Sequence, residues 1–195
     1  MKEFLYLCSV FIKLVYRMDA KKILFIAQEI TPYLPESEIA TICRNLPQGI
    51  QERGREIRTF MPKFGNINER RNQLHEVIRL SGMNLIIDDT DHPLIIKVAS
   101  IQSARMQVYF IDNEDFFQRK STVSDENGNE YEDNDDRSIF YVRGVLETVK
   151  KLGNLNLNRA QTKSTMLFFV VDVCSEGKRL SRNYYFTNYE VRRGV

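Results

Sequence analysis

The stretch that decides the fold is Gln28–Lys63, which reads QEITPYLPESEIATICRNLPQGIQERGREIRTFMPK. The run before it, Lys22–Ala27 (KILFIA), is short and apolar, as is typical of a strand buried on both faces of a parallel sheet. Glu56–Met61 (EIRTFM) is a second extended run, and it ends at Pro62. We therefore expect two neighbouring parallel strands joined by a right-handed crossover.

A helix from about Ser37 to Arg53 is predicted between these two strands. Ser37 is a suitable N-cap, and Gly54 is a stop signal. Pro47 is expected to bend the helix, because its ring removes one backbone hydrogen bond. The apolar residues that recur at helical spacing form the expected buried stripe: Ile39, Ile42, Cys43, Leu46 and Ile50.

The same stretch resembles, without gaps, the opening of the glycogen and starch synthases. That opening runs approximately S-S-E-V-x-P-F-x-K-T-G-G-L-A-D-V-x-x-x-L-P-x-x-L-x-x-x-G-H-x-V-R-V-x-x-P. The matching residues here are Glu29, Pro32, Ala40, Leu46, Pro47, Gly54, Arg58 and Pro62. The resemblance implies an α/β fold, a Rossmann-like three-layer sandwich with a mostly parallel sheet, as in the amino-terminal domain of a GT-B-type glycosyltransferase.

The loop between the first strand and the helix departs from the family pattern. In the synthases, Lys-x-Gly-Gly lets the phosphates of a sugar nucleotide approach the backbone closely. Here Pro35 stands at the Lys position, and Ser37 and Glu38 stand at the two Gly positions. Glu36 and Glu38 would repel a pyrophosphate, or they are ordinary acids that favour the start of a helix. The resemblance makes Glu36 and Ser37 candidate substrate-binding residues.

Short β-rich runs follow the second strand. They are separated by turn residues and comprise Glu76–Leu80, Asn84–Ile87, Leu94–Ser100 and Met106–Ile111. His92 precedes Pro93, and we expect it to face solvent in a turn, without a partner carboxylate that would make it a catalytic base.

Ser121–Asp136 is polar and acidic, so its default interpretation is a mobile, solvated surface loop. The residues around it resemble the synthase frame, in which this loop folds near the donor and acceptor cleft. The residues that carry this resemblance are Phe117, Arg119, Tyr131, Asp133, Asn134 and Arg137. Asn134 and Arg137 are candidates to hydrogen-bond a glucan, or they brace the loop.

A second long helix should follow that loop. Asp136 or Ser138 is its expected cap. Its expected buried stripe is formed by Ile139, Val142, Leu146 and Val149.

Composition excludes several classes of protein. The chain has 195 residues, 43% of them hydrophobic, which suits one domain with a substantial core. A net charge of +2 predicts no nucleic-acid partner. Cys8, Cys43 and Cys174 are scattered and odd in number, which predicts no metal site, no disulfide framework and a cytoplasmic location. No cofactor is expected.

Three segments are expected along the chain. Residues 1–17 form an apolar extension, but Lys13 interrupts it short of the roughly 20 residues that span a bilayer, so no membrane partner is expected. Residues 18–153 resemble the synthase domain, and the resemblance ends at Gly153. Residues 154–195 form a divergent tail, in which Met166–Val173 is a genuine strand or part of an out-of-frame reading.

The resemblance implies glucose transfer from ADP-glucose or UDP-glucose to an α-1,4-glucan in the complete enzyme. No His follows His92, so the family's catalytic His motif is missing, and no second Rossmann-like domain is present. We therefore assign no catalytic residue and expect the chain to be inactive alone. The alternative is a non-catalytic remnant that binds a glucan or a partner. A nucleotide-binding regulator is disfavoured, because no Gly-rich phosphate loop follows the first strand.

Overall fold

The computed structural model describes residues 22–152, 166–171, 182–187 and 190–193. The chain divides into two compact units, and we describe each by itself. Unit 1 comprises residues 1–59 and 161–195, and unit 2 comprises residues 60–160. The predicted extension 1–17 lies outside the described residues.

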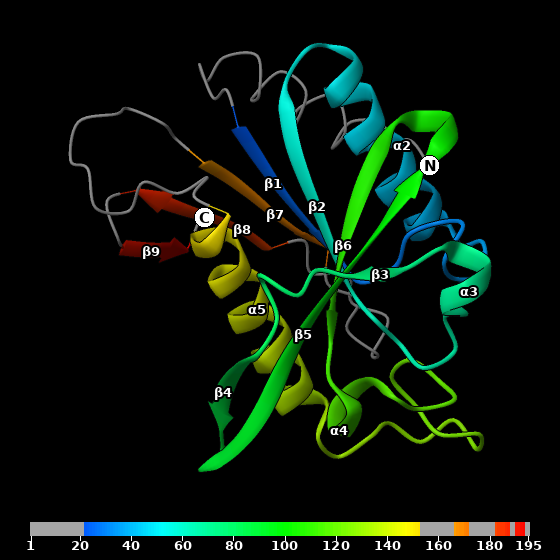
Figure 1. The fold of residues 1–195 in the computed structure, drawn as a ribbon, viewed down its shortest axis with the longest axis vertical. Helices are drawn as coiled ribbons and strands as arrows, with labels where there is room; N and C mark the ends of the chain where they lie inside the picture. Colours follow the sequence, from blue (N-terminus) through cyan, green and yellow to red (C-terminus); the bar gives the residue numbers. More distant parts are fainter. Residues whose placement is uncertain (1–21, 153–165, 172–181, 188–189, 194–195) are drawn as a thin grey trace. The chain divides into compact units, whose positions relative to one another are not determined.

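Unit 1 contains the βαβ elements that the sequence predicts (Figure 1). The strand order β2-β1-β7-β8-β9 makes β1 and β2 neighbours, as predicted, with α2 between them along the chain. β7 pairs with β1 in parallel, whereas β7–β8 and β8–β9 are antiparallel pairs. The elements are β1 (Lys22–Ala27), α2 (Glu38–Glu52), β2 (Glu56–Pro62, whose end belongs to unit 2), β7 (Met166–Val171), β8 (Arg182–Thr187) and β9 (Glu190–Arg193).

Both predicted ends of α2 are confirmed. The Ala40 amide donates to the Ser37 hydroxyl oxygen at 2.9 Å, which makes Ser37 the N-cap. Arg53 is the C-cap, and Gly54 follows it with a φ of 77°, a conformation that glycine adopts without strain.

The buried face of α2 is rotated slightly from the predicted stripe. It is formed by Ala40, Cys43, Pro47 and Ile50. Cys43 and Ile50 were predicted, whereas Ile39, Ile42 and Leu46 are only half-buried. The small Ala40 and the ring of Pro47 occupy the buried face, which a pattern of large aliphatic residues does not indicate.

Unit 2 is built around antiparallel strands. β5 pairs with β3, β4 and β6. Its elements are α3 (Glu69–Asn72), β3 (His75–Glu76), β4 (Met83–Ile87), β5 (Thr90–Ile101), the 3₁₀ turn η1 (Gln102–Ala104), β6 (Met106–Asp112), α4 (Glu114–Phe117) and α5 (Asn134–Lys151). The predicted strand Glu76–Leu80 was wrong beyond Glu76: the Leu80 amide donates to the Val77 carbonyl, which closes a turn.

The predicted cap of α5 was also wrong, and of the predicted stripe only Val149 belongs to the buried face. The helix begins at Asn134, with Asp133 rather than Asp136 or Ser138 at the N-cap position. Ile139 and Val142 are 49% and 42% exposed. The buried face is instead formed by Arg137, Phe140, Tyr141, Gly144, Val145, Thr148 and Val149.

Gly144 explains why α5 turns this face inward. A Cβ atom at residue 144 would lie 2.8 Å from Ile111 Cγ2 and 3.0 Å from Leu94 Cδ1, so the helix backbone approaches the sheet where no side chain intervenes. A glycine, a threonine and an arginine on the buried face carry no hydrophobic periodicity, and the pattern therefore indicated a face that includes the exposed Ile139 and Val142.

The predicted α/β Rossmann-like class is confirmed, and the sheet is mixed because antiparallel hairpins extend it. Among the described residues, no helix has the length and apolar character that crossing a membrane requires.

Gly65 provides a test of the packing in unit 2. A Cβ at this position would lie 2.5 Å from the Arg119 carbonyl oxygen and 2.7 Å from its nitrogen, and both are backbone atoms. Because backbone cannot move aside cheaply, we expect Gly65→Ala to lower the free energy of unfolding by about 1–3 kcal/mol, as overpacking does. Urea denaturation measures the loss.

Gly49→Ala is the matched control. Its Cβ would meet only the flexible end of the Arg53 side chain, at 3.2 Å, inside α2. Alanine has the higher helix propensity, so this variant should be as stable as the parent or up to about 1 kcal/mol more stable. Equal effects of the two substitutions would contradict the close backbone contact at Gly65.

Candidate functional site

The loop after β1 in unit 1 holds the candidates Glu36 and Ser37. The Ser37 hydroxyl donates to Glu29 Oε2 at 2.8 Å and accepts the Ala40 amide hydrogen, so it is engaged on both sides. The Glu36 side chain is exposed to solvent. The structure therefore assigns Ser37 a role in joining the loop to the start of α2.

This loop is electrostatically unsuited to an anion. From Gln28 to Thr41 the chain contains no Lys or Arg, and it carries Glu29, Glu36 and Glu38. The amino end of a helix attracts negative charge, but here Glu38 stands in the first turn and Glu29 contacts the N-cap Ser37.

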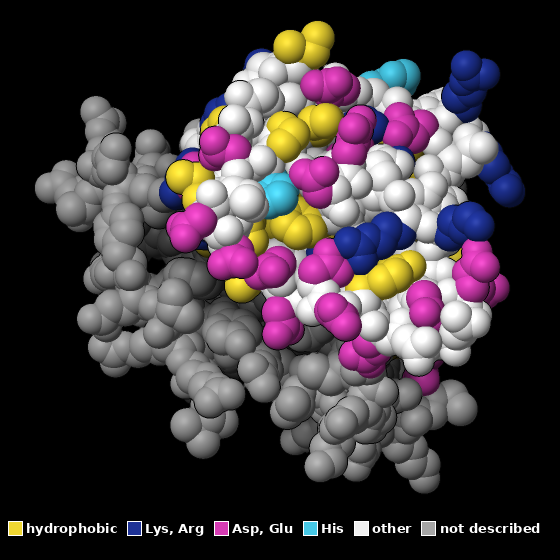
Figure 2. Space-filling view, turned by 90° about the horizontal axis from the view of Figure 1, so that it is seen from below, with side chains coloured by type: hydrophobic (Ala, Val, Ile, Leu, Met, Phe, Trp, Pro, Cys, Tyr) yellow, Lys and Arg dark blue, Asp and Glu magenta, His cyan; other side chains and the backbone are white. Residues whose placement is uncertain are grey.

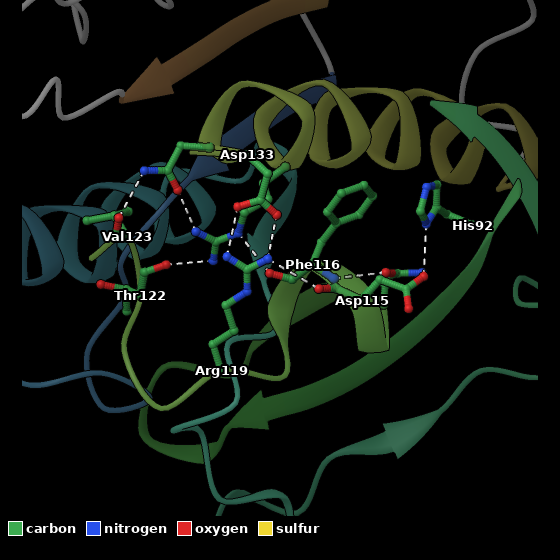
Figure 3. A network of polar contacts seen from close by, with 10 residues as sticks. His92, Asp115, Phe116, Arg119, Thr122, Val123 and Asp133 are labelled. Atoms are coloured by element: carbon green, nitrogen blue, oxygen red, sulfur yellow. Dashed lines mark hydrogen bonds and ion pairs between the residues drawn. The ribbon is translucent and has the colours of Figure 1, made fainter. Parts of the chain in front are cut away.

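The candidates Asn134 and Arg137 lie in unit 2, and they hydrogen-bond to residues that Figure 3 labels. Arg137 is only 4% exposed. Its Nε donates to the Phe116 carbonyl at 2.8 Å, its Nη2 to the Thr122 carbonyl at 2.6 Å and its Nη1 to Asn134 Oδ1 at 2.6 Å. Burial lowers the pKa of Arg137. Asn134 also donates from Nδ2 to the Val123 carbonyl at 2.9 Å.

An ion pair closes the other side of this network. Arg119 binds the Asp133 carboxylate with both terminal nitrogens, one of them at 2.8 Å, and its guanidinium lies 4.5 Å from the ring centre of Tyr131. The hydrogen bond from Arg119 lowers the pKa of Asp133. These contacts, together with those of Arg137, link the segment between α4 and α5 to both helices, an arrangement that braces the segment.

The segment Ser121–Asp136 is thus more ordered than a default surface loop. Asp125 Oδ1 accepts the amide hydrogens of Asn127 and Asn129, each at 2.8 Å, and Ser124 forms a β-bridge with Glu130. Its last residues already belong to α5.

The expectation for His92 was wrong. His92 lies in β5 rather than in a turn, its side chain is 14% exposed, and its ring is tilted against that of Phe116, with 4.5 Å between the ring centres. It has a partner carboxylate, because His92 Nδ1 lies 2.9 Å from Asp115 Oδ2 (Figure 3). His92 Nε2 lies 2.7 Å from Thr90 Oγ1. The turn that was predicted around His92 is instead formed by Asp88 and Asp89.

Sequence reasoning missed a charged cluster in unit 2. Lys63 and Lys97 both contact Glu69 Oε1, at 2.9 and 2.7 Å, and Lys97 also contacts Asp112 Oδ2 at 2.8 Å. Burial alone would lower the pKa of Lys97, but hydrogen bonds to Asp112 and Glu69 outweigh it and raise that pKa. The signal in the sequence that could have indicated this cluster is Lys63, which directly follows Pro62 at the end of a predicted strand.

The described residues contain no group of His, Cys, Asp and Glu side chains arranged to hold a metal ion. Cys43 is buried, and burial raises the pKa of its thiol to about 12, so it is not a reactive nucleophile. Many acidic side chains and fewer basic ones cover the face that Figure 2 shows.

Comparisons with known proteins decide the family. A family profile described as the starch synthase catalytic domain matches residues 22–161. The chain belongs to the starch synthase catalytic domain family. It is 38% identical over 133 residues to a glycogen synthase of Chlorobium limicola and 37% identical over 133 residues to one of Chlorobium phaeobacteroides. Each alignment covers 68% of this chain and 27% of the relative, so the chain spans about a quarter of these relatives' length.

A solved structure supports the same fold. The catalytic domain of starch synthase IV from Arabidopsis thaliana, bound to ADP and acarbose, superposes with a TM-score of 0.57 over 69% of this chain and 26% of the other. The sequence identity is 18%, so this likeness shows the fold alone. It agrees with the predicted amino-terminal domain of a GT-B-type glycosyltransferase.

The Arg119–Asp133 pair makes stability depend on pH. Because the pKa of Asp133 is lower in the folded than in the unfolded state, the pair stabilises the fold at pH above about 4, and this contribution is lost as pH falls through the folded-state pKa. We expect Asp133→Asn to lower the free energy of unfolding by about 1 kcal/mol near neutral pH, and by less at about pH 3. Urea denaturation at both pH values measures the difference.

Glu126→Gln is the control for this measurement. Its ion pair with Lys120 is largely solvent-exposed, at 71% and 86% of the two side chains, so its removal should change little at either pH. A destabilisation by Asp133→Asn that is the same at both pH values would show that charge is not its cause.

Proposed function

We propose that the chain is the amino-terminal part of a glycogen or starch synthase-like glycosyltransferase, and that a polypeptide of these 195 residues does not transfer glucose by itself. In the complete enzyme, the reaction would move glucose from ADP-glucose or UDP-glucose to an α-1,4-glucan. The family match over residues 22–161 carries the first part of this proposal.

The loop after β1 supports the second part. The positions that resemble the family's Lys-x-Gly-Gly hold Pro35, Ser37 and Glu38. The Ser37 hydroxyl already forms hydrogen bonds with Glu29 and with the Ala40 amide. The neighbouring carboxylates would repel a diphosphate. Stabilisation of the developing negative charge on the leaving group is a main source of rate acceleration in such transfers, and this loop offers no cation for it.

A second candidate function is non-catalytic binding of a glucan or a partner. The observation that favours it is the loop after β1, which lacks the cation of the family pattern. Asn134 and Arg137 form hydrogen bonds to neighbouring carbonyls and to each other, so a glucan would contact other residues. A glucan is neutral, so the acidic loop after β1 would not repel it. We place the protein in a cytoplasmic setting, with no nucleic-acid or membrane partner.

The direct test is a transfer assay with the purified chain. With ADP-glucose or UDP-glucose as donor and glycogen as acceptor, we expect no incorporation above a no-protein control, because the family's His motif and the loop cation are absent. A full-length glycogen synthase from one of the relatives serves as the positive control. Clear turnover by the chain would overturn the proposal of inactivity.

A loop graft tests the physical reason. The triple variant Pro35→Lys, Ser37→Gly and Glu38→Gly restores the family pattern, and replacing a Ser N-cap by Gly costs only a few tenths of a kcal/mol. We expect ADP-glucose to bind this variant more tightly than the parent, as measured by calorimetry. The control is Pro35→Ala with Ser37→Gly and Glu38→Gly, which lacks the cation. Equal donor binding by the parent and the graft would show that the loop is not what weakens it.

A further inference from the structure

A buried lysine and a partly buried lysine of unit 2 share a single oxygen of a partly exposed carboxylate. The Lys63 side chain is 3% exposed and the Lys97 side chain 15%, whereas that of Glu69 is 40% exposed. Both ammonium groups contact the same atom, Glu69 Oε1, at 2.9 and 2.7 Å. The two positive charges are therefore held close together by one carboxylate oxygen.

The cluster lies where strands end. Lys63 follows Pro62, the last residue of β2, and Asp112 is the last residue of β6. The Lys63 amide donates to the Ile111 carbonyl at 2.8 Å, which fixes the backbone of Lys63 beside β6. In open α/β sheets, ligands bind beyond strand ends of this kind.

A buried ammonium group requires acceptors, because it carries three donors and loses its hydration on burial. Asp112 is itself buried, and it contacts Lys97 and also accepts a hydrogen bond from Gln118 Nε2 at 3.3 Å. Glu69 accepts from both lysines, but it is the first residue of the single-turn helix α3, and its side chain is 40% exposed. It is therefore the acceptor of this cluster that a dissolved anion can most easily replace.

We propose that Lys63 and Lys97 form an anion site, which a phosphate group occupies by displacing the Glu69 carboxylate. A phosphate oxygen would take the position of Glu69 Oε1 and accept from both ammonium groups, and its other oxygens would face solvent. Glu69 thereby acts as a built-in competitor that keeps the site closed at low phosphate concentration. The site uses none of the residues of the loop after β1, so the proposal does not rest on that loop.

Removing the charge of the competitor tests the proposal. Glu69→Gln leaves both lysines in place and raises the net charge of the cluster by one, so inorganic phosphate should bind at least about tenfold more tightly than to the parent. Calorimetry of the full chain at constant ionic strength measures this, and phosphate should raise Tm more for this variant than for the parent. Glu69→Ala is a second variant with the same expectation.

Two comparisons isolate the lysines. Lys63→Met combined with Glu69→Gln should lose the gain in phosphate affinity, whereas Glu126→Gln, which frees the exposed Lys120, should show no gain.

A phosphate monoester in place of inorganic phosphate then distinguishes the source of the phosphate group. Tighter binding of the monoester indicates a phosphorylated metabolite, and tighter binding of inorganic phosphate indicates the free ion. Unchanged phosphate affinity and Tm in both Glu69 variants, or a gain that persists without Lys63, would overturn the proposal.

Discussion

Arg137 carries a positive charge into the interior of unit 2, and a buried cation is tolerated only where acceptors surround it. The acceptors here are the carbonyls of Phe116 and Thr122 and the side chain of Asn134. Phe116 belongs to α4, Thr122 to the segment after it, and Asn134 to the start of α5. One guanidinium group therefore determines how two helices and the segment between them come together.

Other charged side chains of unit 2 are also paired within the fold. Asp133 and Arg119 pair with each other, and His92 pairs with Asp115. At the positions that resemble the synthase frame near the cleft, Arg119 and Arg137 thus form hydrogen bonds inside the fold. In the loop after β1 the only hydroxyl at a family glycine position, that of Ser37, is likewise engaged internally. This internal use supports the proposal that the chain has the family fold but binds a nucleotide sugar weakly in this loop.

How much the sequence predicted depended on the range of the interactions. The βαβ elements of unit 1 were predictable because caps and stop signals such as Ser37 and Gly54 act within a few residues. The orientation of α5 was not predictable, because it depends on the contact of Gly144 with strands that are distant in the sequence. The partner of His92 stands 23 residues away at Asp115, and no local pattern connects the two. A polar pair between residues so far apart in the sequence can be recognised only once the three-dimensional structure is known.

Hydrogen exchange in an Arg137→Met variant tests most directly whether the buried guanidinium organises unit 2. The Tyr131 amide, which donates to the Val123 carbonyl at 3.2 Å, lies in the braced segment, whereas the amides of α2 lie in unit 1. Loss of the guanidinium leaves the carbonyls of Phe116 and Thr122 without this donor, so the Tyr131 amide should exchange faster while that of Cys43 keeps its protection. Unchanged protection of Tyr131 in a folded variant would contradict this account.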